Sequence, residues 1–105
     1  MSPANILHPL PPDLTEEVFE TLAQSASVKI ERIVSNGQAS PESGWYDQDD
    51  DEWVIVLQGA ATILFEDGTE IALSKGDYLN IPAHERHRVT RTSTDPKTIW
   101  LAVHY

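Results

Sequence analysis

The sequence contains no cysteine, which excludes disulfides, thiolate metal sites and a cysteine nucleophile. Basic residues are also few: 7 Lys and Arg stand against 17 Asp and Glu, and the formal net charge is -10. A charge of this sign repels phosphate backbones and anionic lipid surfaces. We therefore expect neither a nucleic acid nor a membrane as a partner.

Long apolar runs are missing as well. No window approaches the roughly 18 apolar residues that a membrane-spanning helix needs, and residues 1–10 lack a basic start followed by an apolar run. The sequence has no Gly-x-Ser-x-Gly nucleophile elbow and no glycine-rich phosphate loop. The absence of a serine elbow argues against nucleophilic catalysis. The absence of a membrane-spanning run and of a leader pattern leads us to expect a cytoplasmic protein.

The 105 residues suffice for one domain. We divide them into an N-terminal arm with a short helix, residues 1–26, and a barrel, residues 27–105. The arm contains Pro3, Pro9, Pro11 and Pro12, which cannot donate to the middle of a sheet. Asp13 is placed to cap a helix that ends near Gln24 and has four apolar residues on one face: Leu14, Val18, Phe19 and Leu22.

From residue 28 onward the apolar period changes from helical to alternating, which is typical of strands. Turn signals at Gly59, Asp67-Gly68 and Pro82 separate the strands. The predicted strands cover residues 28–34, 54–57, 62–65, 70–73, 78–81, 87–91 and 98–104. Six or seven strands with no helices between them predict an all-β sandwich or barrel.

Two segments resemble the paired sequence motifs of the cupin family. In the first motif, G-x5-H-x-H-x3,4-E-x6-G, Glu52 takes the position of the acid and Gly59 that of the closing glycine. In the second, G-x5-P-x-G-x2-H-x3-N, Gly76, Pro82 and His87 are in place. The resemblance covers about residues 27–105. It implies a small single-domain cupin with a double-stranded β-helix, a jelly-roll barrel that is often dimeric.

The motif histidines are missing from the first segment. With a three-residue gap they fall on Tyr46 and Gln48, and with a four-residue gap on Trp45 and Asp47. In the second segment the inner glycine position holds His84, and the closing Asn position holds Arg91. Neither register therefore supplies the imidazoles that metal-dependent cupins use.

The resemblance implies that Glu52 and His87 are the surviving metal ligands. Gln48 is a weak third ligand, because Tyr46, Gln48 and Glu52 share strand parity and can point into one cavity. The candidate ligand-binding residues are Tyr46, Gln48 and Asp47. Asp47 or His84 would complete the set of metal ligands if the strand is bulged or the loop folds inward. The ion would be Zn, Fe, Mn or Ni, which the residues do not distinguish.

The acidic run from Asp47 to Glu52 fails the EF-hand pattern, because its sixth position is Glu52 instead of Gly and its twelfth is Gln58 instead of Glu. We interpret it as a solvated turn. The alternative is pairing with Arg86, Arg88, Arg91 or a protonated His84, which would lower the carboxylate pKa values and tie the two motif segments together. His84 is interpreted as a structural or surface residue, and nothing marks His8 or His104 as a ligand.

Three functions remain open. The leading hypothesis is a cupin that binds a small molecule or a metal ion in its barrel. The second is a metal-dependent enzyme, which the resemblance suggests to be of isomerase or dioxygenase type. The third is a structural or regulatory module with a degenerate site. Both faces of residues 53–57 are apolar, and we therefore predict a homodimer.

Overall fold

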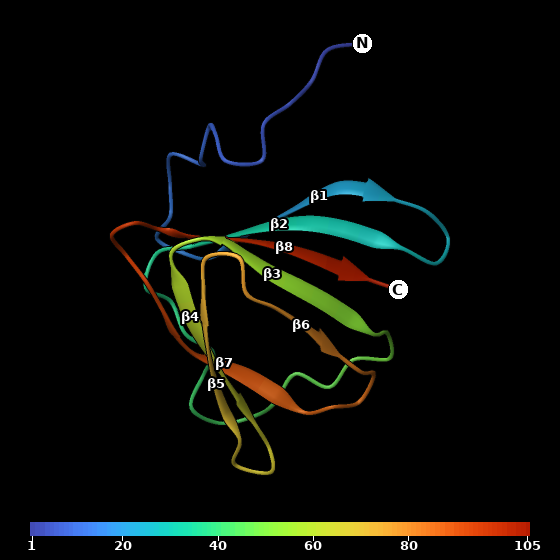
Figure 1. The fold of residues 1–105 in the computed structure, drawn as a ribbon, viewed down its shortest axis with the longest axis vertical. Helices are drawn as coiled ribbons and strands as arrows, with labels where there is room; N and C mark the ends of the chain where they lie inside the picture. Colours follow the sequence, from blue (N-terminus) through green and yellow to red (C-terminus); the bar gives the residue numbers. More distant parts are fainter.

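The computed structural model describes all 105 residues and contains eight β-strands. These strands are β1 Val18–Gln24, β2 Lys29–Ser35, β3 Glu52–Gln58, β4 Ala60–Phe65, β5 Glu70–Ser74, β6 Tyr78–Ile81, β7 His87–Thr92 and β8 Thr98–His104. They form a five-stranded sheet in the order β1-β2-β8-β3-β6 and a three-stranded sheet in the order β5-β4-β7. Figure 1 shows the two sheets facing each other. The predicted all-β double-stranded β-helix is confirmed.

The core lies between the two sheets and follows from the alternation along the strands. In β3, Val54 and Val56 are buried, whereas Trp53, Ile55 and Leu57 are half-buried on the opposite face. β4 alternates in the same way, and its buried residues belong to the core. The buried core residues are Ile33, Val54, Val56, Ala61, Ile63, Phe65, Leu73, Ile81, Trp100 and Ala102.

The predicted N-terminal helix is wrong. The structure contains no helix, and so none that could cross a membrane. Residues 18–24 form β1 instead, pairing with β2 from Val18 opposite Val34 to Gln24 opposite Lys29. The edge of β2 offers backbone partners to this segment, and that tertiary pairing outweighs the helical spacing of its apolar residues.

The N-terminal arm is anchored on the outer face of β2 by Arg32. The guanidinium of this buried residue donates to the carbonyl oxygens of Ile6 (3.2 Å) and Pro9 (3.1 Å) and to the Glu20 carboxylate of β1 (2.6 Å). One side chain therefore joins the arm, the edge strand and β2. In Figure 1 the first residues continue beyond this anchor, away from the barrel.

Gly59 makes the tight connection between β3 and β4 possible. Its φ is +83°, in the left-handed region that favours glycine. A Cβ atom at this position would meet the Ser93 side chain and lie 2.9 Å from the Lys97 carbonyl oxygen. The closing glycine of the first motif is therefore required by both backbone conformation and space.

Candidate functional site

A cavity of about 80 Å³ opens between the two sheets, and both polar and apolar residues line it. Its walls come from residues of β1, β2, β3, β4, β6, β7 and β8 and from the loop before β3. The lining residues are Glu17, Phe19, Glu31, Ile33, Tyr46, Gln48, Glu52, Val54, Ile63, Ile81, His87, Val89, Trp100 and His104. Of the predicted site residues, Tyr46, Gln48, Glu52 and His87 are in this set, and Asp47 is not.

The two motif segments are held together by backbone hydrogen bonds. The Tyr46 N–H donates to the His87 carbonyl (2.8 Å), and the His87 N–H donates to the Tyr46 carbonyl (3.2 Å). The His84 N–H donates to the Gln48 carbonyl at 2.8 Å. These contacts bring residues about 40 positions apart to one end of the cavity, beside the start of β3.

Glu52 and His87 form an acid–imidazole pair in the cavity wall. The Nδ1–H of His87 donates to the Glu85 carbonyl (2.8 Å), which turns Nε2 toward Glu52 Oε1 at 3.5 Å. Burial by itself would lower the pKa of His87, which is 5% exposed. The interactions with Glu52 and with the Glu85 carbonyl outweigh burial, so the pKa of His87 lies above its ordinary value.

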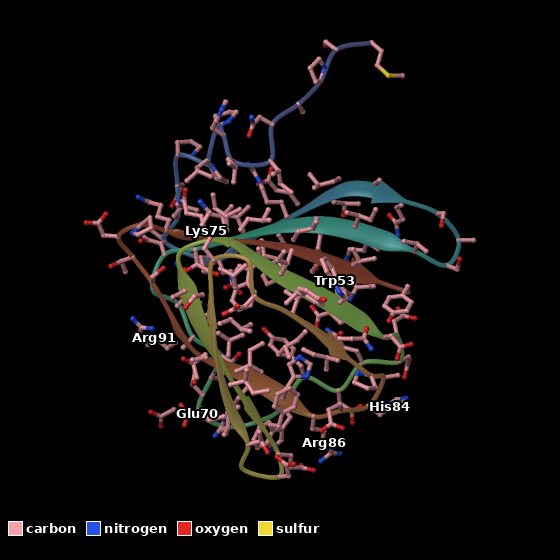
Figure 2. The ribbon with its side chains drawn as sticks, in the orientation of Figure 1. Trp53, Glu70, Lys75, His84, Arg86 and Arg91 are labelled. Atoms are coloured by element: carbon pink, nitrogen blue, oxygen red, sulfur yellow. The ribbon has the colours of Figure 1, made fainter.

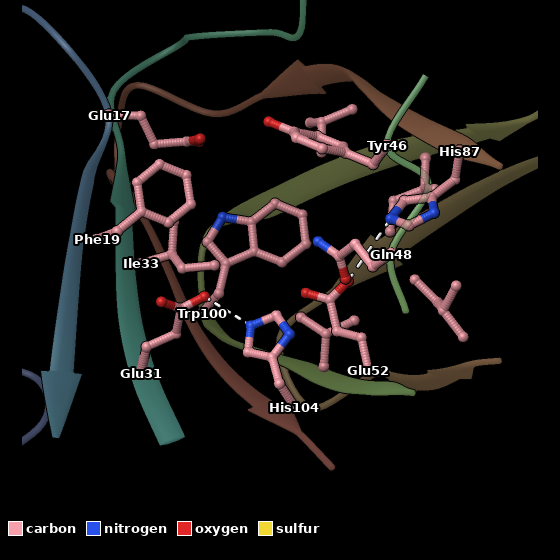
Figure 3. A pocket seen from close by; sticks show the side chains of 14 residues that line it. Glu17, Phe19, Glu31, Ile33, Tyr46, Gln48, Glu52, His87, Trp100 and His104 are labelled. Carbon is pink, nitrogen blue, oxygen red and sulfur yellow. Dashed lines mark hydrogen bonds and ion pairs between the residues drawn. The ribbon is translucent and has the colours of Figure 1, made fainter. Parts of the chain in front are cut away.

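Gln48 contributes an unpartnered acceptor to the same end of the cavity. Its Oε1 atom is buried and has no hydrogen-bond partner in the protein. Figure 3 shows the side chains of Gln48, Glu52 and His87 grouped on one side of the cavity. A buried amide oxygen without a donor costs roughly 1 to 3 kcal/mol, so a bound molecule or ion that supplies a positive group gains from this arrangement.

Tyr46 forms part of the same wall and is partly exposed to solvent. Its ring centroid lies 5.7 Å from that of His87, with the planes inclined by 42°. The Tyr46 side chain also lines the cavity, and the residue is 41% exposed. It therefore sits where a ligand would enter.

Asp47 points away from the cavity and pairs with the second motif segment. Its carboxylate accepts from His84 Nδ1 (2.7 Å) and from Arg86 Nε (3.2 Å), and Figure 2 shows His84 and Arg86 at the edge of the molecule. The hydrogen bond from His84 holds the pKa of Asp47 below its ordinary value, with a further contribution from Arg86. Asp47 thus follows the alternative considered for the acidic run, pairing with His84 and Arg86, whereas Asp49 and Asp50 are exposed, as expected for a solvated turn. His84 is exposed.

His84 adopts the backbone conformation that the motif assigns to glycine. Its φ is +64°, and its position corresponds to the inner glycine of the second motif. The left-handed region is disfavoured for residues with a Cβ. The His84 hydrogen bonds to the Gln48 carbonyl and the Asp47 carboxylate offset that cost.

We expect Asp47→Asn to return the pKa of His84 toward its ordinary value. The hydrogen bond and charge of Asp47 are the main causes that raise it, and Asp49 at 3.5 Å adds a smaller contribution. The pKa of His84 is raised and that of Asp47 is lowered. The pair therefore stabilises the fold only at pH values between these two pKa values. The contribution is lost as pH rises through the folded pKa of His84 or falls through that of Asp47.

The measurement is a proton NMR titration of the His84 ring in the wild-type protein and in Asp47→Asn. Asp50→Asn is the control, since Asp50 is exposed and belongs to the same acidic run but makes no ion pair. An unchanged His84 titration in Asp47→Asn would show that this pairing does not hold in solution.

Sequence reasoning missed a second acid–imidazole pair in the lining, formed by Glu31 and His104. Glu31 is 6% exposed, and its Oε1 lies 2.8 Å from His104 Nε2. In Figure 3 this pair lies across the cavity from Gln48, with the Trp100 ring between them in that view. Strand parity could have found both residues, because Glu31 shares a face with Ile33 in β2 and His104 shares a face with Trp100 in β8.

Glu17 and Phe19 of the N-terminal segment also line the cavity and were missed. The helix prediction placed both residues outside the barrel, whereas β1 closes one side of it. The Ser35 hydroxyl donates to the Glu17 carboxylate. Burial raises the pKa of Glu17 above its ordinary value, although the bond from Ser35 opposes the shift.

The lining does not contain a complete set of strong metal ligands. No group of three or more His, Cys, Asp or Glu side chains in the chain is placed to hold a metal ion. Glu52 and His87 are close enough to share one ion, and Gln48 Oε1 is a neutral third donor. These residues fit an ion that is held weakly, with the remaining positions filled from solvent or ligand.

The two facing sheets and the site inside them define a double-stranded β-helix protein. A family model described as the cupin domain matches residues 33–104, and the chain belongs to this family. No curated protein matches the chain.

Solved structures agree with this assignment. A protein from Ralstonia eutropha JMP134, provisionally described as a mannose-6-phosphate isomerase, is 44% identical over 99% of this chain and 97% of its own, with a TM-score of 0.93. A cupin superfamily protein from Desulfitobacterium hafniense DCB-2 is 24% identical, covering 90% and 82%, with a TM-score of 0.75. The structure called FeII HppE is 17% identical, covering 85% and 50%, with a TM-score of 0.71. The last two share the fold.

Proposed function

We propose that this cupin binds a small molecule in the barrel cavity and recognises it through Gln48, Glu52 and His87. The observation that carries the proposal is the unpartnered, buried Oε1 of Gln48 beside the Glu52–His87 pair. Native proteins seldom leave a buried polar atom unsatisfied, and a cavity of about 80 Å³ gives a ligand access to it. Tyr46 stands at the entrance.

A divalent metal ion at the same residues is the second candidate. It is favoured by the orientation of His87, since the bond from Nδ1 to the Glu85 carbonyl fixes the ring so that Nε2 faces Glu52. A bound ion would act as a Lewis acid on a substrate oxygen, which is the chemistry that an isomerase or dioxygenase would need. Zn, Fe, Mn and Ni all accept this mixture of nitrogen and oxygen donors.

The activity in the description of the Ralstonia protein does not transfer readily to this cavity. A sugar phosphate carries two negative charges near neutral pH, and sites for it usually contain Arg or Lys. The fourteen lining residues include three glutamates but no Arg or Lys. A mannose-6-phosphate isomerase activity would therefore require a metal ion or a basic group from elsewhere.

The homodimer and the location in the cytoplasm stay predictions made from the sequence.

We expect His87→Ala to abolish binding in the cavity. Thermal unfolding is measured with a small-molecule library and with divalent ions, alongside metal analysis of protein purified without added metal. A ligand at about 100 times its Kd stabilises the native state by about 2.7 kcal/mol, and the variant should lose that gain. Stoichiometric metal that disappears in His87→Ala would favour the second candidate.

The control is His84→Ala, which removes an exposed imidazole three residues away. It should retain both ligand binding and any bound metal. Stabilisation that survives in His87→Ala would place the binding site elsewhere. A protein that no compound and no ion stabilises would instead be a structural or regulatory module with an inert cavity.

A further inference from the structure

The charged groups of the cavity are mostly acids. Glu17, Glu31 and Glu52 line it, whereas none of the fourteen lining residues is Lys or Arg. His87 and His104 are the only side chains in the lining that can carry a positive charge, and each already faces a carboxylate. The chain as a whole has a formal net charge of -10, which attracts cations toward the opening.

The acceptors at this end of the cavity are incompletely satisfied: Gln48 Oε1 has no donor, and Glu52 has only a long contact with His87. The 3.5 Å separation of Glu52 Oε1 and His87 Nε2 exceeds the roughly 2.7 to 2.9 Å of a charge-assisted hydrogen bond. The buried Gln48 Oε1 has no partner at all. An ammonium group offers three N–H donors and a positive charge, and Figure 3 shows Gln48 and Glu52 on the same side of the cavity, where one cation could lie beside both.

The opposite side of the cavity combines an apolar and aromatic surface with the Glu31–His104 pair. Trp100 is 3% exposed, and its indole N–H already donates to Ser35 Oγ at 3.1 Å. The only hydrogen-bond donor of the indole is therefore satisfied, and the ring forms an apolar wall together with Phe19 and Ile33. Such a wall suits a carbon chain, and an indole face also attracts a nearby cation.

The size of the cavity limits the ligand to a small molecule. A cavity of about 80 Å³ is much larger than the roughly 10 to 15 Å³ that one water molecule requires, so it can hold a short carbon chain with a polar head.

We propose that the cavity binds a small alkylammonium ion, with the ammonium group between Gln48 and Glu52 and the carbon chain against Trp100. This inference rests on the proposed function and specifies its ligand class. It distinguishes the protein from a sugar-phosphate binder, because the group to be recognised is cationic and its counter-charges are the cavity carboxylates.

The test is calorimetric titration of chelator-treated protein at pH 8 with three probes of similar size: n-butylammonium, 1-butanol and butyrate. We expect n-butylammonium to bind at least tenfold more tightly than 1-butanol, and butyrate not to bind. Glu52→Gln should weaken the binding of n-butylammonium at least tenfold. Glu70→Gln, which alters an exposed glutamate of β5, should leave its affinity unchanged.

Preference for 1-butanol or butyrate would overturn the ligand class while leaving cavity binding intact. The ligand class would also be wrong, and cavity binding would stand, if none of the three probes bound but another compound stabilised the wild-type protein and not His87→Ala. Failure of every compound would overturn the proposed function as well. An affinity for n-butylammonium that is equal in Glu52→Gln would also overturn the inference.

Discussion

Trp100→Ala is expected to lower the free energy of unfolding by about 3 to 5 kcal/mol, the usual loss when a buried tryptophan is truncated to alanine. Trp100 lies in β8, the middle strand of the five-stranded sheet, and is 3% exposed. It belongs to the core cluster and also forms the apolar wall of the cavity. Domains of this size are stable by only about 5 to 15 kcal/mol, so the loss should be obvious in urea denaturation.

Two further variants separate packing from hydrogen bonding at this position. Trp100→Phe keeps most of the buried ring but removes the donor to Ser35, and it should cost about 1 to 2 kcal/mol. Trp53→Ala removes a tryptophan of β3 that is half-buried on the outer face, next to Tyr78 at 5.4 Å, and its effect should be clearly smaller than that of Trp100→Ala. Equal losses for the two alanine variants would contradict the assignment of the core to the space between the sheets.

Arg32→Met is expected to lower the free energy of unfolding by about 2 to 3 kcal/mol and to release the N-terminal arm. The variant loses two hydrogen bonds to Glu20 and one each to the Ile6 and Pro9 carbonyls. Hydrogen bonds of a charged group contribute about 1.5 to 3 kcal/mol. The expected loss is smaller than the sum over four such hydrogen bonds, because Glu20 is 38% exposed and its carboxylate can be solvated in the variant.

Urea denaturation measures the stability of Arg32→Met, and limited proteolysis measures access to residues 1–12. Arg91→Met is the matched control, because Arg91 is an exposed arginine of β7 without an ion pair. Its stability should change by less than about 0.5 kcal/mol. If Arg32→Met unfolded at the same urea concentration as the wild type and its arm stayed protected, the arm would not depend on this anchor.

The barrel could be predicted from the sequence because short apolar or alternating segments are separated by residues that favour turns. The predicted bounds of β6 and β8 agree with the structure, and Gly59 and the Asp67-Gly68 pair lie at turns. β1 could not be predicted in the same way. Its apolar residues also fit a helical face, and only the neighbouring edge of β2 decides between the two conformations.

The candidate site was predicted only at residues within the cupin motifs. Glu52, His87 and Gln48 follow from motif position and strand parity, and the structure brings all three to one cavity. Glu31 and His104 lie 73 residues apart, and the sequence gives no sign that β2 and β8 are neighbours. The orientation of Asp47 depends on His84 and Arg86 in a loop that parity does not describe.

The central claim is that a ligand binds beside Gln48, Glu52 and His87 inside the barrel. Its most direct test is solution NMR of the Gln48 side-chain amide and the His87 ring during titration with n-butylammonium or another stabilising compound. We predict saturable shifts of both signals and none for the amide of Gln58, whose Nε2 donates to the Lys97 carbonyl. A compound that binds while the Gln48 and His87 signals stay in place would contradict the claim.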